Sequence, residues 1–528
     1  MKKVTALILA AMLVMVMLAA CGEAPAENTA APTPDVTAGA APLSAQGETG
    51  GESDSAAPKY VFLFIGDGMS YPQIQATADY LGALEDEDYM QAEPSLDDNG
   101  GAVLDGPVAL NFMNFEAAGS AVTYDSNSFA PDSASTATSI ATGFKTYSGS
   151  INVDETGTIE YETIAEKVHE QLGWEVGVIS SVNLNHATPA AFYAHQASRS
   201  SYYEIGLELV DSGFEYFAGG GLLSPEGYDE ANPSESLYDL AEEAGYTVTF
   251  DYASADEIGS GDKAILIDEY LADGDSIAYE IDRTDDMWSL ADYVEKGIEV
   301  LMNDTGFFMM CEGGKIDWAC HANDAASSIN DTLALADAVQ VAIDFAEEHP
   351  EETLILVTGD HETGGLTIGF AGTDYDTYLS LLESQTISFT QFDEQYVAEY
   401  KANGTSFEEV LADIEELFGL KTEGEEGDKL VLTEYEIETL RAAYEKSVNG
   451  TATSSYEQEE YVLYGTYEPL SVTITHIINN KSGVSFTSYS HTGLPVAVFA
   501  DGVGAEQFNG YYDNTDIYNK LADMLGVE

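Results

Sequence analysis

Asp132-Ser133-Ala134 opens a stretch of small and hydroxylated residues that runs to Thr142 and ends at Gly143. This composition predicts a helix with Ser133 at its N-terminus. Free N–H groups and a partial positive charge there attract anions and favour an alkoxide. Ser133 is therefore a candidate nucleophile, although the same residues also fit a plain N-cap at Asp132 or Ser133.

A serine hydroxyl is a weak nucleophile near neutral pH, so it needs a base, a metal ion or a positive field beside it. If the attacked group is a phosphoryl group, two metal ions about 4 Å apart can activate the hydroxyl and neutralise the charge. The rest of the chain should then supply Asp, His and Glu as ligands, and an arginine for the phosphoryl oxygens.

Asp317 and His321 form one candidate pair of ligands. Residues four apart lie on one face of a helix, and carboxylate and imidazole both suit zinc. The apolar run Gly306–Cys311 and then Glu312-Gly313-Gly314 precede the pair, which indicates a strand, a glycine turn and the start of a helix. Without that context such a pair is more often at the surface than in a metal site.

Two further acidic positions directly follow strand-like runs. Asp360-His361 follows Thr353–Thr358, and Asp67 follows Tyr60–Ile65 after one glycine. Ligands at the carboxyl ends of strands face the functional edge of an α/β sheet. Each residue taken singly could instead be a polar loop residue that caps the next helix.

The apolar runs are continuous rather than alternating, as in Val61–Ile65, Val176–Ser180, Phe307–Cys311 and Leu354–Val357. Continuous runs are typical of parallel strands that are buried on both faces. The chain from residue 59 to residue 528 is long enough for one large core. We expect an α/β fold, a three-layer sandwich in which helices flank a central, mostly parallel sheet.

His186-Ala187-Thr188-Pro189 with Arg199, and His491-Thr492-Gly493, complete a set of six segments. Arg199 is one of three arginines; a guanidinium can grip two phosphate oxygens, but it could also anchor a salt bridge. In type and order, from about Lys59 to the C-terminus, the six segments resemble the alkaline phosphatase family.

The resemblance implies hydrolysis of small phosphate monoesters through a phosphoserine at Ser133, and a homodimer. Arg199 and Asp132 would bind the phosphate. The implied cofactors are two Zn²⁺ and one Mg²⁺. The implied ligands are Asp317, His321 and His491 for the first zinc; Asp67, Asp360 and His361, with Ser133, for the second; and Asp67, Thr188 and Glu312 for magnesium.

His186 is a neighbour of the third site at which family members differ. Some carry Asp there, and Lys at the position of Trp318. An imidazole tolerates zinc better than an aspartate does, so the identity of the third ion depends on His186. Oxygen ligands still favour magnesium.

The N-terminus resembles a bacterial lipoprotein signal. Lys2 and Lys3 precede an apolar stretch, and Leu18-Ala19-Ala20-Cys21 is a small-residue cleavage pattern ending in cysteine. We expect a signal peptide at 1–20, a lipidated Cys21, and a disordered acidic tether at 21–58 that is rich in Ala, Pro and Gly. The protein would be exported and anchored to the membrane at the cell surface or periplasmic face; an ordinary secretory signal is the alternative.

The composition restricts the partners and the redox chemistry. Asp and Glu number 94 against 17 Lys and Arg, a net charge of −77, which disfavours nucleic-acid binding through a broad surface. Beyond Cys21, only Cys311 and Cys320 remain, too few for a disulfide framework. We expect both to be buried thiols, and a cysteine ligand is the weaker alternative.

Residues 375–470 carry no ligand motif. Apolar residues recur at helical spacing in Ser406–Gly419, and two capping boxes, Ser406 with Glu409 and Thr433 with Glu436, predict helix starts. We expect a largely helical insertion that forms a cap or rim beside the site.

Other functions remain alternatives at this stage. A phosphodiesterase of the same superfamily is disfavoured because Thr188 and Glu312 supply a third site that diesterases lack. No sulfatase motif is present. The lipoprotein signal and tether also suit a solute-binding surface lipoprotein or an inactive surface protein.

Overall fold

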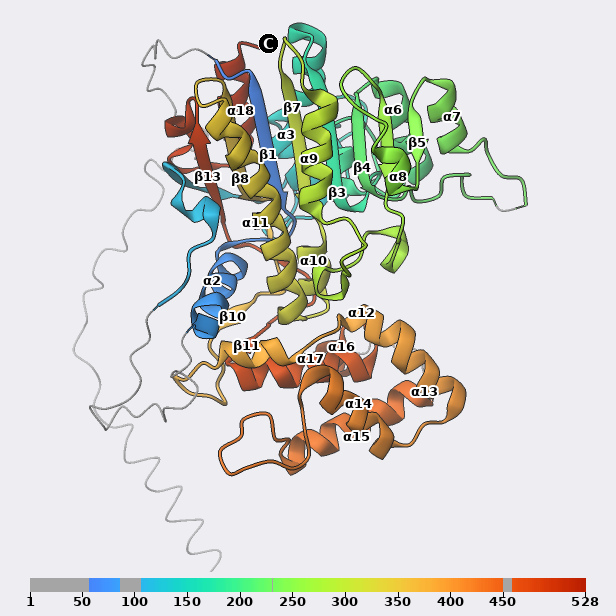
Figure 1. Ribbon diagram of the computed structural model, residues 1–528, viewed down its shortest axis with the longest axis vertical. Helices are drawn as coiled ribbons and strands as arrows, with labels where there is room; N and C mark the ends of the chain where they lie inside the picture. Colours follow the sequence, from blue (N-terminus) through green and yellow to red (C-terminus); the bar gives the residue numbers. More distant parts are fainter. Residues whose placement is uncertain (1–56, 86–105, 230, 450–457) are drawn as a thin grey trace, which may run out of the picture. The chain divides into compact units, whose positions relative to one another are not determined.

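The computed structural model describes residues 57–85, 106–229, 231–449 and 458–528. The predicted signal at 1–20, Cys21 and nearly all of the predicted tether at 21–58 lie outside these residues. The described chain centres on a ten-stranded sheet (Figure 1). Its spatial order is β14 (Gly510–Asp513), β2 (Ala117–Val122), β13 (Val496–Gly502), β8 (Thr353–Gly359), β1 (Tyr60–Gly66), β7 (Phe307–Gly313), β3 (Glu175–Asn183), β4 (Tyr216–Gly220), β6 (Ala264–Ile267) and β5 (Thr247–Thr249).

Strand β13 is antiparallel to both of its neighbours, β2 and β8. All other neighbouring pairs in this sheet are parallel. The prediction of a mostly parallel sheet is therefore confirmed.

Alternate residues of the central strand β1 enter two different apolar clusters. Tyr60, Phe62 and Phe64 pack with α9 (Leu290–Leu301) and α11 (Ala325–Glu348), which cross the near face of the sheet in Figure 1. The intervening residues pack in the cluster that contains α3 (Ser133–Thr142), α6 (Tyr202–Ser212) and α18 (Thr515–Leu525). Helices thus cover both faces, which explains the continuous apolar runs and confirms the three-layer α/β fold.

The core contains further helices of 4 to 15 residues. They are α2 (Tyr71–Glu85), α4 (Ile164–Lys167), α5 (Ala187–Ala190), α7 (Leu237–Glu243), α8 (Tyr252–Ala255) and α10 (Lys315–His321). Cys311 in β7 and Cys320 in α10 are both buried and free, as expected of packing thiols.

Residues 379–449 and 458–482, called the helical segment below, form the lower part of Figure 1. Its elements are η6 (Leu379–Ser384), α12 (Phe389–Phe392), η7 (Asp393–Val397), α13 (Ala398–Asn403), α14 (Phe407–Phe418), α15 (Glu434–Val448), α16 (Gln458–Tyr464) and α17 (Pro469–Ser482). Both capping boxes form, at Ser406 and at Thr433. The helical region extends beyond its predicted end at Leu470, because α17 runs from Pro469 to Ser482. Proline is tolerated at the first position of a helix, where no N–H is needed.

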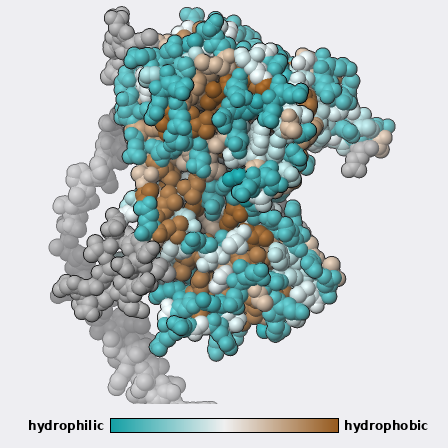
Figure 2. Space-filling model, in the orientation of Figure 1, coloured by the Kyte–Doolittle hydropathy of each residue, from teal (hydrophilic) through white to brown (hydrophobic). Residues whose placement is uncertain are grey.

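The helical segment shares an apolar cluster with the core. Val410, Phe418 and Leu470 pack in one cluster with Tyr80 of α2 and Ile329 of α11. In Figure 2 hydrophobic residues gather across the middle of the visible face, between mostly hydrophilic upper and lower surfaces. Among the helices of the described residues, none combines the length and the apolar character that a membrane crossing requires.

Candidate active site

Three neighbouring strands end level with one another. The parallel register pairs Gly66 of β1 with Gly313 of β7 and with Gly359 of β8. Asp67 and Asp360 follow two of these glycines, and Glu312 precedes the third. The carboxyl ends of parallel strands therefore bring the predicted acidic residues to one edge of the sheet.

Gly359 allows this close approach. A Cβ at residue 359 would lie 1.8 Å from the carbonyl oxygen of Met69, so any side chain would push the two loops apart. With glycine there, the Gly68 N–H donates to Asp360 Oδ1 at 3.1 Å. The loop after β1 is thereby tied to the loop after β8.

The group predicted for the second zinc comes together. His361 Nε2 lies 3.3 Å from Asp67 Oδ1 and 3.3 Å from Asp360 Oδ2. It also lies 3.2 Å from Ser133 Oγ. All four residues are buried.

The group predicted for the first zinc lies beside it. His321 Nε2 is 3.1 Å from His491 Nε2 and 3.3 Å from Asp317 Oδ2, and His491 Nε2 is 3.6 Å from Asp317 Oδ1. Helix α10 carries Asp317 and His321 on one face, as their spacing predicts. Strand β12 (His491–Thr492) pairs with β9 (Glu362–Thr363), and the rings of His491 and His361 stack at 3.7 Å.

Hydrogen bonds orient all three imidazoles. The Nδ1–H groups of His321 and His491 donate to the carbonyl oxygens of Tyr489 and Pro131, each at 2.6 Å. Thr363 Oγ1 donates to Asp317, so its oxygen accepts the Nδ1–H of His361 at 3.3 Å. Each Nε2 lone pair therefore points into the cluster, which is the arrangement of metal-bound histidines.

The buried carboxylates of the cluster also favour the binding of cations. Burial and the neighbouring carboxylates raise the pKa of Asp67 well above its ordinary value. Burial raises the pKa values of Asp360 and Glu312 to about 7. Bare imidazole nitrogens and carboxylates that face one another repel unless a cation lies between them. This set of nitrogen and oxygen donors fits zinc.

The residues predicted for the third ion are also adjacent. Thr188 Oγ1 donates to Asp67 Oδ2 at 3.2 Å, and Ser180 donates to Glu312 Oε2. Asp67 Oδ1 and Glu312 Oε1 are buried without a hydrogen-bond partner among the described residues. These oxygen donors suit magnesium.

His186 lies beside Arg199, the residue predicted to bind phosphate. Its Nε2 is 3.3 Å from Arg199 Nη2, and its ring meets the Trp318 ring edge-on at 5.9 Å. Burial and the nearby Arg199 charge lower the pKa of His186 to about 3. A neutral imidazole at this position accepts the Arg199 N–H and so orients the guanidinium.

Asp132 and Arg199 form an ion pair at the start of α3. Arg199 Nη1 donates to Asp132 Oδ2 at 2.9 Å, while Oδ1 accepts from the Ser135 and Gly149 N–H groups. Burial opposes ionisation of Asp132, but Arg199 and these hydrogen bonds outweigh it, and its pKa is lowered. Asp132 is thus an N-cap, and it also holds Arg199 beside Ser133.

A cavity of about 400 Å³ opens over this centre. Predicted residues in its lining are Ser133, His186, Arg199, Asp317, His321 and His491. Five other residues also line it, Asp273, Trp318, Phe389, Thr390 and Tyr467, and of these the sequence pointed only to Trp318, as a position at which family members differ. The hydrogen-bond acceptors Pro131 O and Tyr489 O had no signal, because main-chain atoms leave no signature in a sequence.

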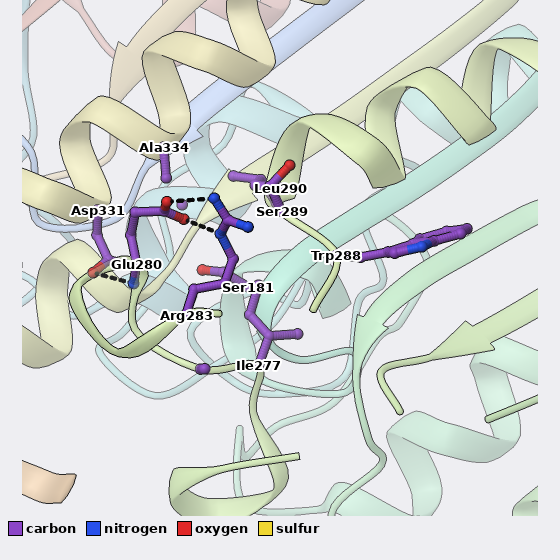
Figure 3. A pocket seen from close by; sticks show the side chains of 11 residues that line it. Ser181, Ile277, Glu280, Arg283, Trp288, Ser289, Leu290, Asp331 and Ala334 are labelled. Atoms are coloured by element: carbon purple, nitrogen blue, oxygen red, sulfur yellow. Dashed lines mark hydrogen bonds and ion pairs between the residues drawn. The ribbon is translucent and has the colours of Figure 1, made fainter. Parts of the chain in front are cut away.

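A second cavity, shown in Figure 3, measures only about 10 Å³ and holds at most one water. Arg283 beside it donates two hydrogen bonds of 2.8 Å to Glu280, whose N–H donates to Asp331 at 3.3 Å. Arg441 lies over the ring of Phe407. Arg199 is therefore the arginine of the active-site cavity, whereas Arg283 has a structural partner.

Comparisons with known proteins agree with this geometry. The family model described as alkaline phosphatase matches residues 58–213 and 270–527. Alkaline phosphatase 3 of Bacillus subtilis is 31% identical over 491 residues, covering 91% of this chain and 92% of that protein. Alkaline phosphatase 4 of the same organism is 28% identical over 480 residues, with 90% of each chain covered.

A solved structure, the cold-active alkaline phosphatase of Shewanella sp., superposes with a TM-score of 0.68 at 28% identity. The superposition covers 88% of this chain and 99% of that one. Residues 214–269, between the two ranges of the family model, contain β4, β5 and β6 at one edge of the sheet. With a matching family model over most of its length, this chain belongs to the alkaline phosphatase family of hydrolases.

Proposed function

We propose that the chain hydrolyses phosphate monoesters through a phosphoserine at Ser133, with two Zn²⁺ and one Mg²⁺. The supporting observation is the position of Ser133. Its Oγ lies 3.2 Å from His361 Nε2, at the N-terminus of α3 and in the cavity that also contains Arg199.

The proposed ligand sets are those that the family resemblance implies, and the convergence of these side chains at the sheet edge supports them. They are Asp317, His321 and His491 for one zinc, Asp67, Asp360 and His361 for the other, and Asp67, Thr188 and Glu312 for magnesium. When bound, such ions polarise hydroxyl groups and neutralise phosphoryl charge.

The residues of the chain position both reactants. Arg199, held by Asp132, grips two phosphoryl oxygens, and the N–H groups of α3 favour negative charge beside Ser133. Ser133 loses its proton as Oγ bonds to phosphorus, and the ester P–O bond breaks, releasing the alcohol with a proton. Water then attacks phosphorus, the P–Oγ bond breaks, inorganic phosphate leaves and Ser133 recovers its proton.

Hydrolysis of p-nitrophenyl phosphate by the purified protein tests this proposal. A chelator should abolish activity, and zinc with magnesium should restore it together with two zinc and one magnesium per chain. The diester bis(p-nitrophenyl) phosphate should be a much poorer substrate, since Thr188 and Glu312 provide a third site. Chelator-resistant hydrolysis, or a preference for the diester, would contradict the proposal.

For localisation, we propose an exported enzyme that is anchored to the membrane through lipidated Cys21. The support is the lipoprotein-like signal and the tether that follows it. Cys21→Ala should release the enzyme from membranes without changing its specific activity, because the proposed site begins at Asp67. A Cys21→Ala protein that stays on membranes after signal cleavage would contradict a lipid anchor at that residue.

A further inference from the structure

Part of the cavity lining is aromatic and contributes none of the proposed metal or phosphate ligands. Phe389 and Tyr467 come from the helical segment, and Trp318 comes from α10. Asp273, in the turn η4 (Asp273–Asp275), and Thr390 lie in the same lining. The helical segment therefore forms one wall of the cavity in which the ester must bind.

The aromatic rings support one another by edge-to-face packing. The rings of Phe389 and Tyr467 lie 5.7 Å apart at 85°, and those of Phe389 and Tyr279 lie 5.9 Å apart at 67°. Trp318 packs on the same cluster and meets the ring of His186. Such packing holds ring faces and edges in fixed positions, where they can stack on another ring.

Hydrogen bonds connect this wall to the start of α11 and to η5 (Glu280–Asp282). Asp324, the N-cap of α11, accepts from the Phe389 N–H at 3.0 Å and from Gln385 Nε2 at 2.8 Å. The Ser388 N–H donates to Asp282 Oδ1 at 2.9 Å. Because Asp324 follows His321 by three residues, Phe389 is placed relative to the proposed metal ligands.

The charge of the wall selects against anionic groups. Lys315 is fully buried; its Nζ lies 3.9 Å from the centre of the Tyr279 ring and 4.8 Å from that of Trp318, and thus behind the wall. Its distance to Asp273 Oδ2 is 3.8 Å. Asp273 is the charged group that this wall presents to the cavity, and its ion pair with Lys315 offsets only part of its charge from behind. An anionic leaving group would therefore meet a carboxylate and no exposed cation on this wall.

We propose that Trp318, Phe389 and Tyr467 form a leaving-group subsite that makes the enzyme prefer phosphate monoesters of uncharged aromatic alcohols. The inference rests on the proposed monoesterase function. The phosphoryl group binds at Ser133 and Arg199, and the aromatic group of the alcohol packs against the wall. Stacking of one ring on such a wall should favour it about 2- to 12-fold over a non-aromatic group of equal size.

Three substrates isolate this effect: benzyl, cyclohexylmethyl and ethyl phosphate. All three release primary alcohols, so their intrinsic reactivities are similar. The metal-loaded enzyme should show the highest kcat/KM for benzyl phosphate, about 2- to 12-fold above cyclohexylmethyl phosphate, with the difference mainly in KM. Ethyl phosphate should be about 10-fold or more below benzyl phosphate, because it buries no ring.

The double variant Phe389→Leu/Tyr467→Leu removes both rings and keeps apolar bulk. Its benzyl-to-cyclohexylmethyl ratio should fall toward one. Metal content and inhibition by inorganic phosphate, which has no leaving group, should stay as in the wild type. Phe389→Tyr and Tyr467→Phe keep the rings and should keep the ratio, as should Tyr435→Ala, which changes an exposed residue of α15.

Asp273→Asn tests the charge of the wall separately. It should raise kcat/KM for 2-phosphoglycolate, whose leaving group carries a carboxylate, relative to ethyl phosphate. An unchanged ratio would remove Asp273 from the proposal.

Four results would overturn the subsite. The first is equal kcat/KM for the benzyl and cyclohexylmethyl esters in the wild type. The second and third concern the double variant: an undiminished benzyl preference, or altered inhibition by inorganic phosphate. The fourth is a higher kcat/KM for choline phosphate than for benzyl phosphate, which would indicate an aromatic cage for a cation. Absence of turnover of all three esters by the wild-type holoenzyme would instead contradict the monoesterase function itself.

Discussion

The two sides of the cavity are built in different ways. At the sheet edge, the level strands place Asp67, Asp360 and His361, all buried, while α10 and β12 add His321 and His491. Hydrogen bonds to Thr363, Tyr489 and Pro131 orient the three rings. On the opposing wall, α12 carries Phe389, and the turn between α16 and α17 carries Tyr467. The two rings pack on each other, and the Phe389 N–H donates to Asp324 of the core. Under the proposed function, the catalytic residues lie on strand ends of the core, whereas the residues that would select the substrate lie on a segment that can vary without disturbing them.

The largest expected effect is on the sheet-edge side. Ser133→Ala should lower turnover of p-nitrophenyl phosphate by on the order of 10³-fold or more, because it removes the nucleophile, while metal content stays unchanged. Ser139→Ala, on the same helix, should leave turnover near the wild-type rate, since its hydroxyl only donates to the Ser135 carbonyl. Wild-type turnover by Ser133→Ala would contradict the assignment.

Arg199→Ala should give the next largest effect. Losing a charged bidentate contact costs on the order of 1.5–3 kcal/mol, which weakens inhibition by inorganic phosphate about 10- to 150-fold. Arg441→Ala is the matched control, because Arg441 lies over Phe407 in the helical segment. Equal phosphate inhibition in the two variants would place Arg199 outside the binding site.

Asp324 joins the two sides, so its loss should affect stability. Asp324→Ala removes the N-cap of α11 and the acceptor of the Phe389 N–H, and it leaves Gln385 Nε2 with only its second acceptor, Ile387 O. We expect a loss on the order of 3 kcal/mol in the free energy of unfolding, measured in urea. Asp324→Asn keeps one oxygen acceptor, so its free energy of unfolding should lie between those of the wild type and Asp324→Ala. An Asp324→Ala variant as stable as the wild type would show that the contacts of Asp324 contribute no stability.

The stability of the helical segment should fall as pH rises from about 4 to about 8, because of Asp393. The pKa of this carboxyl is raised from 3.8 to about 8, mainly by burial and to a smaller extent by Glu468 and Glu394, against the lowering effects of a Ser471 hydrogen bond and Lys401. The folded state therefore holds a proton that the unfolded state has lost between these two values. Stability contributed by Asp393 falls as pH rises from about 4 to about 8 and stays lower above that range.

Asp393→Asn removes this titration. The fall in thermal midpoint between pH 5.5 and pH 9 should be smaller in the variant than in the wild type, by about 2 °C or more. Identical pH dependence of the two proteins would show that Asp393 is ionised throughout, and that the segment does not loosen through this group.

The sequence predicts the sheet edge much better than the wall. Runs such as Tyr60–Ile65 are continuous because both faces of the strand are buried, and the ligands follow such runs directly. The antiparallel direction of β13 could not be predicted, because an apolar run does not show in which direction a strand crosses the sheet. Phe389 and Tyr467 lie far apart in the sequence without a motif, and only tertiary packing around Asp324 brings the Phe389 segment to the site.

Trapping the phosphoenzyme tests the central claim most directly. The metal-loaded wild type, incubated with radiolabelled inorganic phosphate and quenched in acid, should carry label on the peptide that contains Ser133. Ser133→Ala should carry none. Label on another residue, or hydrolysis of a chiral phosphate monoester in water with inversion at phosphorus, would contradict a covalent intermediate at Ser133.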